Sequence, residues 1–420
     1  MKALVIDRDV ARFGAARLAS SLRAGGGARV GPLTLDEIDP PALPGPDWVR
    51  LLPRLSGICG SDLATVDGRS SRWFEPIVSF PFTPGHEVVA DHPDGHRVVV
   101  EPVLGCVARG LDPVCAACAD GRLGNCEHLT HGCVDAGLQT GYCCDTGGGW
   151  SEQMVAHPSQ IHFVPDELDD CAAVMIEPTA CAVHAALSAR VQAHETVALI
   201  GAGTLGLLTI AALDRWSPPH RLIVAAKYPH QRTLAREFTS ASGGAGGPGI
   251  VTCEPDELAR AVRRSVGTRM VAPQTPGADD RLTGGADVTI DCVGNAESIR
   301  SALAVTRPGG RVVMVGMPGV ETVDLTPLWQ REISLTGAYA YGTETLGGQR
   351  FRTFDLAAEL VAAADLGRLV SATYPLSRYA DALAHAGSAG RLGAVKIAFD
   401  TRDPDHPATP TLPPRKAARR

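Results

Sequence analysis

A glycine-rich turn near the middle of the chain constrains its fold more than any other feature. The run Gly201-Ala202-Gly203-Thr204-Leu205-Gly206 follows an apolar, strand-like segment, Thr196–Ile200, and opens a segment with helical character that extends to about Leu213. A strand, a G-x-G-x-x-G turn and a helix in this order are typical of a dinucleotide-binding βαβ unit. The first glycine permits the turn, the second lets the backbone approach a pyrophosphate, and the third allows close helix–strand packing. We therefore expect Gly201, Gly203, Thr204, Leu205 and Gly206 to bind a dinucleotide.

The secondary-structure pattern of the sequence differs between the part before about residue 165 and the part that contains this turn. Before about residue 165, short β-rich pieces broken by Gly and Pro predict an irregular, mostly β domain. From about residue 166, strand-like and helical segments alternate, which predicts a parallel sheet with crossover helices. The expected strands are 197–200, 222–225, 287–291, 311–315 and 333–335, and the expected helices are 172–189, 231–238, 256–266 and 296–306.

The next expected strand bears on which dinucleotide is bound. An acid about twenty residues after the turn would bind the ribose 2′-hydroxyl of NAD. The segment 225–232 contains no carboxylate, whereas Lys227, His230 and Arg232 are suited to a 2′-phosphate. The sequence therefore favours NADP, with NAD as the alternative.

Three scattered motifs carry residues of the types that zinc accepts as ligands. They are Cys59 in GICGSD, His86 and Glu87 in PGHE, and Glu177 in IEP. Thiolate, imidazole and carboxylate ligands with one open position make a catalytic zinc site.

A second group consists of cysteines alone. Cys115-x-x-Cys118, with Cys126 eight residues later and Cys106 upstream, has typical metal spacing, and four thiolates would close a tetrahedral structural zinc site. The chain has twelve cysteines but opens without the long apolar stretch of a signal peptide. A cytoplasmic location is therefore expected, and there metal binding is a better interpretation than disulfides. Free or redox-active thiols are the alternative.

Composition excludes some partners. The net charge is −7 and aromatic residues make up 5% of the chain, so we expect no nucleic acid partner. The longest apolar run, Val197–Leu213, is interrupted by glycines and is at the lower length limit for a membrane span, so we expect no membrane association.

The order of these motifs and of two others along the chain is similar to that of a known protein family. With GICGSD, PGHE, the cysteine group, IEP, GAGTLG, ADVTIDCVG and RPGGRVVMVG, the chain resembles the zinc-dependent medium-chain dehydrogenase/reductase family, close to its alcohol, polyol and sugar dehydrogenases. The resemblance covers about residues 1–400. It implies an α/β protein with a GroES-like, mostly β catalytic domain (1–165, resumed at 343–400) and a doubly wound, parallel-sheet Rossmann domain (166–342). Residues 401–420, rich in proline and ending in RKAARR, are expected to form a disordered tail.

The resemblance also implies roles for single residues. Cys59 and His86 correspond to the two constant ligands of the catalytic zinc. The third ligand is a glutamate, for which Glu177 is favoured and Glu87 is the alternative. Asp62 would orient His86, and Ser61 would bond the substrate oxygen. The cofactor-binding positions further along the chain are Val293, Val315 and Gly316.

The chain departs from the family pattern in three places. Cys106 lies nine residues before Cys115, where three is usual, so an insertion, Val107–Asp112, is expected to loop out, and Asp112 is a possible substitute ligand. Ala64 occupies the position of a proton-relay histidine. The acid after the second Rossmann strand is missing.

These features predict a zinc-dependent oxidoreductase that transfers a hydride between a secondary alcohol, polyol or sugar hydroxyl and NAD(P). Zinc would lower the pKa of the substrate hydroxyl, and Ser61 would accept its proton. The long Cys59–His86 interval, which includes Arg72 and Glu75, resembles the polyol and sugar branch. The alternatives are a zinc-free enoyl or quinone reductase and a non-catalytic zinc- or nucleotide-binding redox sensor. By resemblance, a homodimer or homotetramer is expected.

Overall fold

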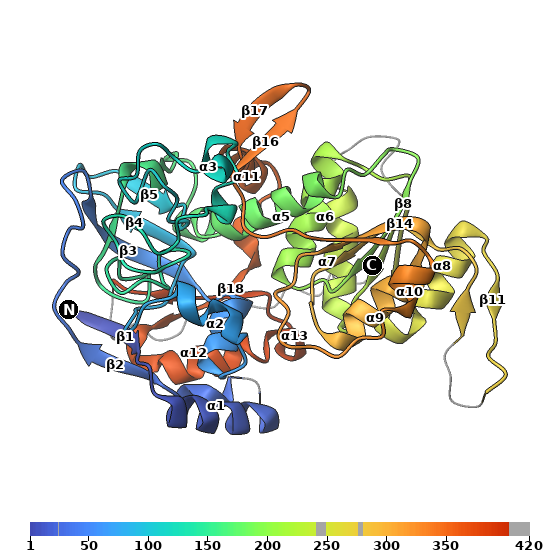
Figure 1. Ribbon diagram of the computed structural model, residues 1–420, viewed down its shortest axis with the longest axis horizontal. Helices are drawn as coiled ribbons and strands as arrows, with labels where there is room; N and C mark the ends of the chain where they lie inside the picture. Colours follow the sequence, from blue (N-terminus) through green and yellow to red (C-terminus); the bar gives the residue numbers. More distant parts are fainter. Residues whose placement is uncertain (24, 241–248, 276–279, 403–420) are drawn as a thin grey trace, which may run out of the picture. The chain divides into compact units, whose positions relative to one another are not determined.

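The computed structural model describes residues 1–23, 25–240, 249–275 and 280–402. The chain divides into two compact units, one made of Met1–Glu177 and the described residues from Tyr341 onward, the other of Pro178–Ala340 (Figure 1). The first boundary falls within the first turn of helix α5 (Ile176–Ser188). Most of the tail that we expected to be disordered, residues 403–420, lies outside the described residues.

The second unit is built around a six-stranded sheet in which every pairing is parallel. Its strands are β8 (Thr196–Ile200), β9 (Arg221–Ala225), β10 (Gly249–Cys253), β13 (Ala286–Asp291), β14 (Thr306–Met314) and β15 (Ser334–Gly337). The spatial order β10-β9-β8-β13-β14-β15 is the 3-2-1-4-5-6 order of a Rossmann sheet. The expected parallel sheet with crossover helices is therefore confirmed.

Helices cover this sheet through small and aliphatic side chains. Leu258, Ala261 and Val262 of α8 share one helix face and pack, with residues of α9, against Ile223 of β9. Besides α5, most of which belongs to this unit, its helices are α6 (Thr204–Trp216), α7 (Pro229–Ser240), α8 (Leu258–Val266), α9 (Ala296–Val305) and α10 (Thr326–Gln330). A small antiparallel pair, β11 (Met270–Val271) and β12 (Arg281–Leu282), was not expected from the sequence.

The first unit contains a seven-stranded sheet with the order β18-β19-β3-β4-β5-β7, in which β6 also pairs with β3. The strands are β3 (Val49–Gly57), β4 (Val88–Asp91), β5 (Arg97–Val100), β6 (Met154–Ala156), β7 (Ile161–Phe163), β18 (Val370–Pro375) and β19 (Lys396–Asp400). The last strand, β19, pairs antiparallel with β3, so the end of the chain completes a sheet begun near its start. The expected mostly β unit is confirmed, and Trp150 and Phe399 form part of its core with ring centroids 5.0 Å apart.

Several elements of this unit were not predicted. They are β1 (Lys2–Ile6), α1 (Val10–Leu22), β2 (Leu33–Glu37), the hairpin of β16 (Thr343–Leu346) and β17 (Gln349–Arg352), α12 (Tyr379–Ala386) and α13 (Ala389–Leu392). The hairpin is drawn in orange in Figure 1, next to α11 (Thr353–Ala363). Short helices α2 (Gly60–Val66), α3 (Ala116–Ala119) and α4 (Asp170–Ala173) complete the unit.

One helical stretch has the length and hydropathy of a membrane span. Asp170–Ser188, which comprises α4 and α5, has a mean hydropathy of 1.4, and 67% of its most apolar window is buried within the protein. This burial is typical of a core helix.

Candidate metal centres and dinucleotide site

A thiol, an imidazole and a carboxylate converge inside the first unit. Candidate ligand atoms of Cys59, His86 and Glu87 all lie within 4.8 Å of one another. Cys59 follows β3 and His86 and Glu87 precede β4, and these paired strands bring the two segments together, with the Gly57 N–H donating to the Glu87 carbonyl at 2.8 Å. His86 and Glu87 are buried, with 4% and 1% exposure. Thiolate, imidazole and carboxylate are ligands that zinc accepts, so this donor set fits zinc.

Asp62 fixes two members of this cluster. Its Oδ2 accepts the Cys59 N–H at 2.9 Å, and its Oδ1 lies 3.3 Å from Nδ1 of His86. The second ring nitrogen of His86, Nε2, is thereby left for a metal. Burial opposes protonation of His86, but Asp62 and Cys59 outweigh it and raise the pKa of His86 well above its ordinary value.

Lys396 is a member of this site that the sequence analysis missed. Its ammonium group pairs with Glu87, and both side chains are buried, with 3% and 1% exposure. Nζ also donates to the Ile58 carbonyl at 3.2 Å. Burial lowers the pKa of Lys396, but the charge of Glu87 more than reverses this effect and raises it. No local motif marks Lys396, because it reaches the site only through the pairing of β19 with β3.

Glu177 lies outside the cluster of three candidate ligands. Its Oε1 accepts the Tyr341 hydroxyl at 2.9 Å, and Glu177 is 5% exposed. Burial raises the pKa of Glu177 to about 7, while the His86 charge and the Tyr341 hydrogen bond act in the opposite direction. The sequence favoured Glu177 as the third ligand, whereas the structure brings Glu87 together with Cys59 and His86.

Ser61, the residue expected to bond the substrate, lies on α2, and Glu75 of the Cys59–His86 interval lies in a later turn. Ser61 is half-buried in the first turn of α2, and Ala64 lies three residues further along the same helix. Glu75 lies in a 3₁₀ turn, Arg72–Ile77, and pairs with Arg8 at 2.5 Å. This ion pair lines an open cavity of about 640 Å³ together with Pro76, Val78, Ser79 and Phe80.

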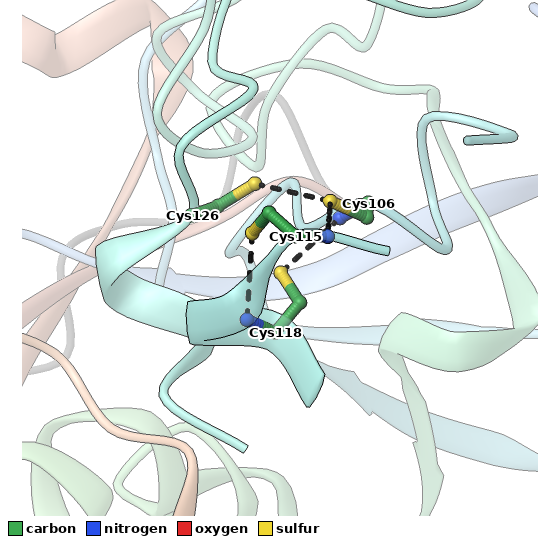
Figure 2. Close-up of side chains that lie close together, drawn as sticks. All are labelled: Cys106, Cys115, Cys118 and Cys126. Atoms are coloured by element: carbon green, nitrogen blue, oxygen red, sulfur yellow. Dashed lines mark hydrogen bonds between the residues drawn. The ribbon is translucent and has the colours of Figure 1, made fainter. Parts of the chain in front are cut away.

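The four cysteines of the second group gather around one point (Figure 2). Their sulfur atoms lie within 4.8 Å of one another, and Sγ of Cys106 is 3.6 Å from Sγ of Cys126. Zn–S bonds of 2.3 Å at tetrahedral angles place sulfurs about 3.8 Å apart, so the arrangement fits zinc. Backbone N–H groups also point at the sulfurs, such as Cys115 N–H toward Cys106 at 3.3 Å. Asp112 is not a member of this group.

The insertion Val107–Asp112 does not simply loop out, which corrects the expectation from spacing. Val107 is 54% exposed, but Arg109 is completely buried. The Arg109 guanidinium donates to backbone carbonyl groups at both ends of a loop, those of Leu104, His131, Val134, Asp135 and Gly137. Burial lowers the pKa of Arg109, and nearby cysteines act in the opposite direction. Arg109 of the insertion therefore holds the segment 131–137 in place through hydrogen bonds to its backbone.

The glycine turn has the geometry that its sequence predicts. Gly201 has φ +91°, and its N–H donates to the Ala225 carbonyl at 2.9 Å. A Cβ on Gly206 would lie 1.8 Å from the Gly201 carbonyl oxygen, so α6 packs directly on the turn. A Cβ on Gly203 would meet nothing within 4 Å, which leaves its surface open to a ligand. Thr204 and Leu205 form the first turn of α6. The turn fits a dinucleotide pyrophosphate.

The end of β9 carries no acid, and its cations differ in their surroundings. Lys227 is exposed. Arg232 donates to the Ala226 carbonyl at 2.8 Å and to Glu254 at 3.1 Å, so its guanidinium is fixed against the loop. The His230 ring stacks on Tyr228 with centroids 5.9 Å apart.

Asp291 organises the other expected cofactor positions. Its Oδ1 accepts the Val293 N–H at 2.9 Å, and its carbonyl accepts the N–H groups of Val315 and Gly316 at 2.8 and 3.0 Å. Burial raises the pKa of Asp291. The motif ADVTIDCVG contains this aspartate, but its role as a buried anchor for two loops was not predicted.

Two family matches cover different parts of the chain. Residues 45–166 match the alcohol dehydrogenase GroES-like domain, and residues 241–360 match the zinc-binding dehydrogenase family. Together these matches cover more than half of the chain.

Individual proteins are similar along most of their length. A sorbitol dehydrogenase of Arabidopsis thaliana is 28% identical over 319 residues, which are 73% of this chain and 78% of that protein. An L-threonine 3-dehydrogenase of Streptomyces avermitilis is 28% identical over 369 residues, 86% of this chain and 94% of that protein.

The fold is shared with solved structures. A zinc-binding dehydrogenase from Sinorhizobium meliloti, solved with NADP, superimposes with a TM-score of 0.64 at 23% identity and covers 88% of this chain and 96% of its own. The order of motifs, the two family matches and the fold lead to one assignment: the chain belongs to the zinc-dependent medium-chain alcohol and polyol dehydrogenase family.

Proposed function

We propose that this protein oxidises a secondary alcohol, polyol or sugar hydroxyl, or reduces the corresponding carbonyl, with NAD(P) as the hydride carrier. The observation that carries the proposal is the buried set of Cys59, His86 and Glu87, whose ligand atoms lie within 4.8 Å of one another. It occurs in a chain that also contains a Rossmann glycine turn. A zinc ion held by this set supplies the Lewis acidity that makes the substrate hydroxyl acidic near neutral pH.

The chain's own residues hold and orient this site. The Asp62 carboxylate, 3.3 Å from Nδ1 of His86, orients the His86 ring, and Lys396 holds Glu87 in place by a buried ion pair. We assign Glu87 as the third zinc ligand, because its carboxylate lies with the ligand atoms of Cys59 and His86 within 4.8 Å, a group that does not include Glu177. Cys106, Cys115, Cys118 and Cys126 hold a second, structural zinc.

Ser61 is proposed to accept the substrate proton, as the family resemblance implies. It lies on α2, two residues after Cys59. Ala64, one helical turn from Ser61, has no ionisable group, so the proton leaves by a route that does not use this position.

The cofactor is proposed to be NADP in preference to NAD. The absence of a carboxylate between Ala225 and Arg232 removes the usual partner of the NAD ribose, and exposed Lys227 is available to a 2′-phosphate. Arg232 contributes less than the sequence indicates, because Ala226 and Glu254 already engage its guanidinium.

The substrate class is proposed from the named relatives, which include a sorbitol dehydrogenase and an L-idonate 5-dehydrogenase. The test is a panel of polyols, aldoses and secondary alcohols with each dinucleotide, followed by absorbance of the reduced cofactor. We expect turnover on a polyol or sugar, two zinc ions per chain, and higher kcat/KM with NADP. Turnover without zinc would support an enoyl or quinone reductase, and bound zinc without any turnover would support a redox sensor.

A homodimer or homotetramer in the cytoplasm is proposed as the working state. The edge strand β15 is exposed along its whole length, and the side chains of Val320, Leu325 and Trp329, which precede it in the sequence, are 92%, 56% and 80% exposed. None of the twelve cysteines forms a disulfide, as expected in a reducing compartment. Light scattering after gel filtration and cell fractionation test these two points.

A further inference from the structure

We propose that Tyr142 is a positioning residue for the catalytic metal: its hydroxyl donates to Asp62 and fixes the carboxylate that orients His86. The inference rests on the proposed function, because it takes Cys59, His86 and Glu87 to hold zinc. Tyr142 belongs to no motif that the sequence analysis singled out.

The contacts form a chain that leads away from the metal ligands. The Tyr142 hydroxyl lies 3.3 Å from Oδ1 of Asp62, the same oxygen that lies 3.3 Å from Nδ1 of His86. Oδ2 of Asp62 is occupied by the Cys59 N–H at 2.9 Å. Asp62 and Tyr142 are buried, with 1% and 9% exposure. Tyr142 therefore donates a hydrogen bond to a buried carboxylate oxygen that lies beside the imidazole.

The direction of the Tyr142 proton follows from its neighbours. Thr65 Oγ1 lies 3.3 Å from the Tyr142 hydroxyl, but Thr65 donates its own proton to the Ser61 carbonyl at 2.9 Å. The single proton of Tyr142 thus has two acceptors in reach, and the carboxylate of Asp62 is the stronger one. Burial and the charge of Asp62 raise the pKa of Tyr142, so the hydroxyl keeps this proton at neutral pH.

The backbone places Tyr142 beside the metal-binding segment. The preceding residue, Gly141, has φ +85°, and a Cβ there would lie 3.1 Å from the Gly85 carbonyl oxygen, directly before His86. The Tyr142 ring lies 5.2 Å from the Phe82 ring and 6.0 Å from the His86 ring, measured between centroids. These contacts hold the hydroxyl in a fixed direction rather than allowing it to rotate toward solvent.

The expected effect of Tyr142 is on how long the metal stays bound. Removing the partner that orients a ligating histidine changes metal affinity by about 10- to 100-fold. Tyr142 acts one residue further out, through Asp62, so we expect Tyr142→Phe to release the catalytic zinc about 3- to 10-fold faster. The tetracysteine zinc should be unaffected.

The experiment measures zinc release from the intact, zinc-loaded protein into a chromophoric chelator. Cys59→Ala identifies which phase belongs to the catalytic site. Tyr142→Phe is then made in the native and the Asp62→Ala background. If Tyr142 acts through Asp62, its effect is present in the first background and disappears in the second. Tyr374→Phe is the matched control, since Tyr374 bonds His385 in the same unit.

Each outcome decides one question. An unchanged release rate in Tyr142→Phe overturns the inference, as does an equal acceleration in both backgrounds, which would mean general loosening of the fold. If the native protein shows no release phase that Cys59→Ala removes, the proposed zinc site itself fails, and that result is distinct from the others.

Discussion

The buried ion pair of Lys396 with Glu87 balances the charge of this glutamate in the metal site. Removing one partner of such a pair leaves an uncompensated charge and costs about 3–5 kcal/mol. We expect Lys396→Met to lower the free energy of unfolding of the zinc-free protein by about 3 kcal/mol, measured by urea denaturation and Trp fluorescence. Added zinc should reduce this deficit, because the cation replaces the lost charge next to Glu87. Lys396→Arg is the control, and a deficit that zinc does not reduce would contradict Glu87 as a ligand.

Glu195 provides a residue-scale prediction for acid stability. The Arg311 guanidinium bonds both oxygens of Glu195, at 2.9 and 2.6 Å, and this contact lowers the pKa of Glu195 in the folded state. A lowered folded pKa contributes stability above the unfolded pKa of about 4.3, and this contribution is lost as the pH falls. We expect Glu195→Gln to be less stable than the native protein at pH 7 and the difference to shrink below about pH 4. Thermal midpoints across this range provide the measurement.

At the scale of elements, two glycines of the turn before α6 have different roles. Gly206 is needed for folding, and Gly203 is needed for dinucleotide binding. Gly206→Ala places a Cβ 1.8 Å from the Gly201 oxygen, so we expect it to destabilise the unit. Gly203→Ala meets nothing within 4 Å and should keep the native thermal midpoint while weakening dinucleotide binding about tenfold or more, since a methyl group blocks the approach of the pyrophosphate. Fluorescence titration with NADPH tests the difference. Equal binding by Gly203→Ala and the native protein would show that the turn does not hold the pyrophosphate.

Arg109, which lies in the insertion between Cys106 and Cys115, holds residues 131–137 in place through hydrogen bonds. Arg109 has backbone carbonyls as hydrogen-bond partners, so Arg109→Met leaves several buried acceptors unpaired, each at about 1–3 kcal/mol. We expect faster cleavage by a protease within residues 131–137 and faster loss of the tetracysteine zinc. Arg109→Lys should show an intermediate effect, because a lysine donates fewer hydrogen bonds. Native-like protection in Arg109→Met would show that Arg109 does not hold residues 131–137 in place.

Elements of regular pattern could be predicted, and those that depend on distant pairing could not. The run from β8 to α6 was predicted because strand, turn and helix each have a local signal. Arg109 illustrates the opposite case, since spacing alone indicated a solvated loop where the structure has a buried guanidinium. Lys396 and Tyr341 were missed for a related reason: each reaches its glutamate from the C-terminal part of the chain. The choice between Glu87 and Glu177 likewise required geometry, because both are suitable ligands by residue type.

At the scale of the whole molecule, metal and dinucleotide residues belong to different compact units. We therefore expect Cys59→Ser or His86→Ala to abolish turnover while the dissociation constant for NADP changes by less than about threefold, because the glycine turn lies in the other unit. Steady-state kinetics and cofactor titration on the same preparations check both halves. Full turnover by either variant would disprove the proposed catalytic site.

Because Lys396 lies on β19, its ion pair with Glu87 can form only late in protein synthesis. Lys396 donates to a carbonyl 338 residues earlier in the chain, beside Cys59. On the ribosome, Cys59, His86 and Glu87 emerge long before their cationic partner has been translated. A nascent or prematurely terminated chain thus contains these three side chains without the ammonium group that pairs with Glu87, and the complete site can form only after β19 has been translated.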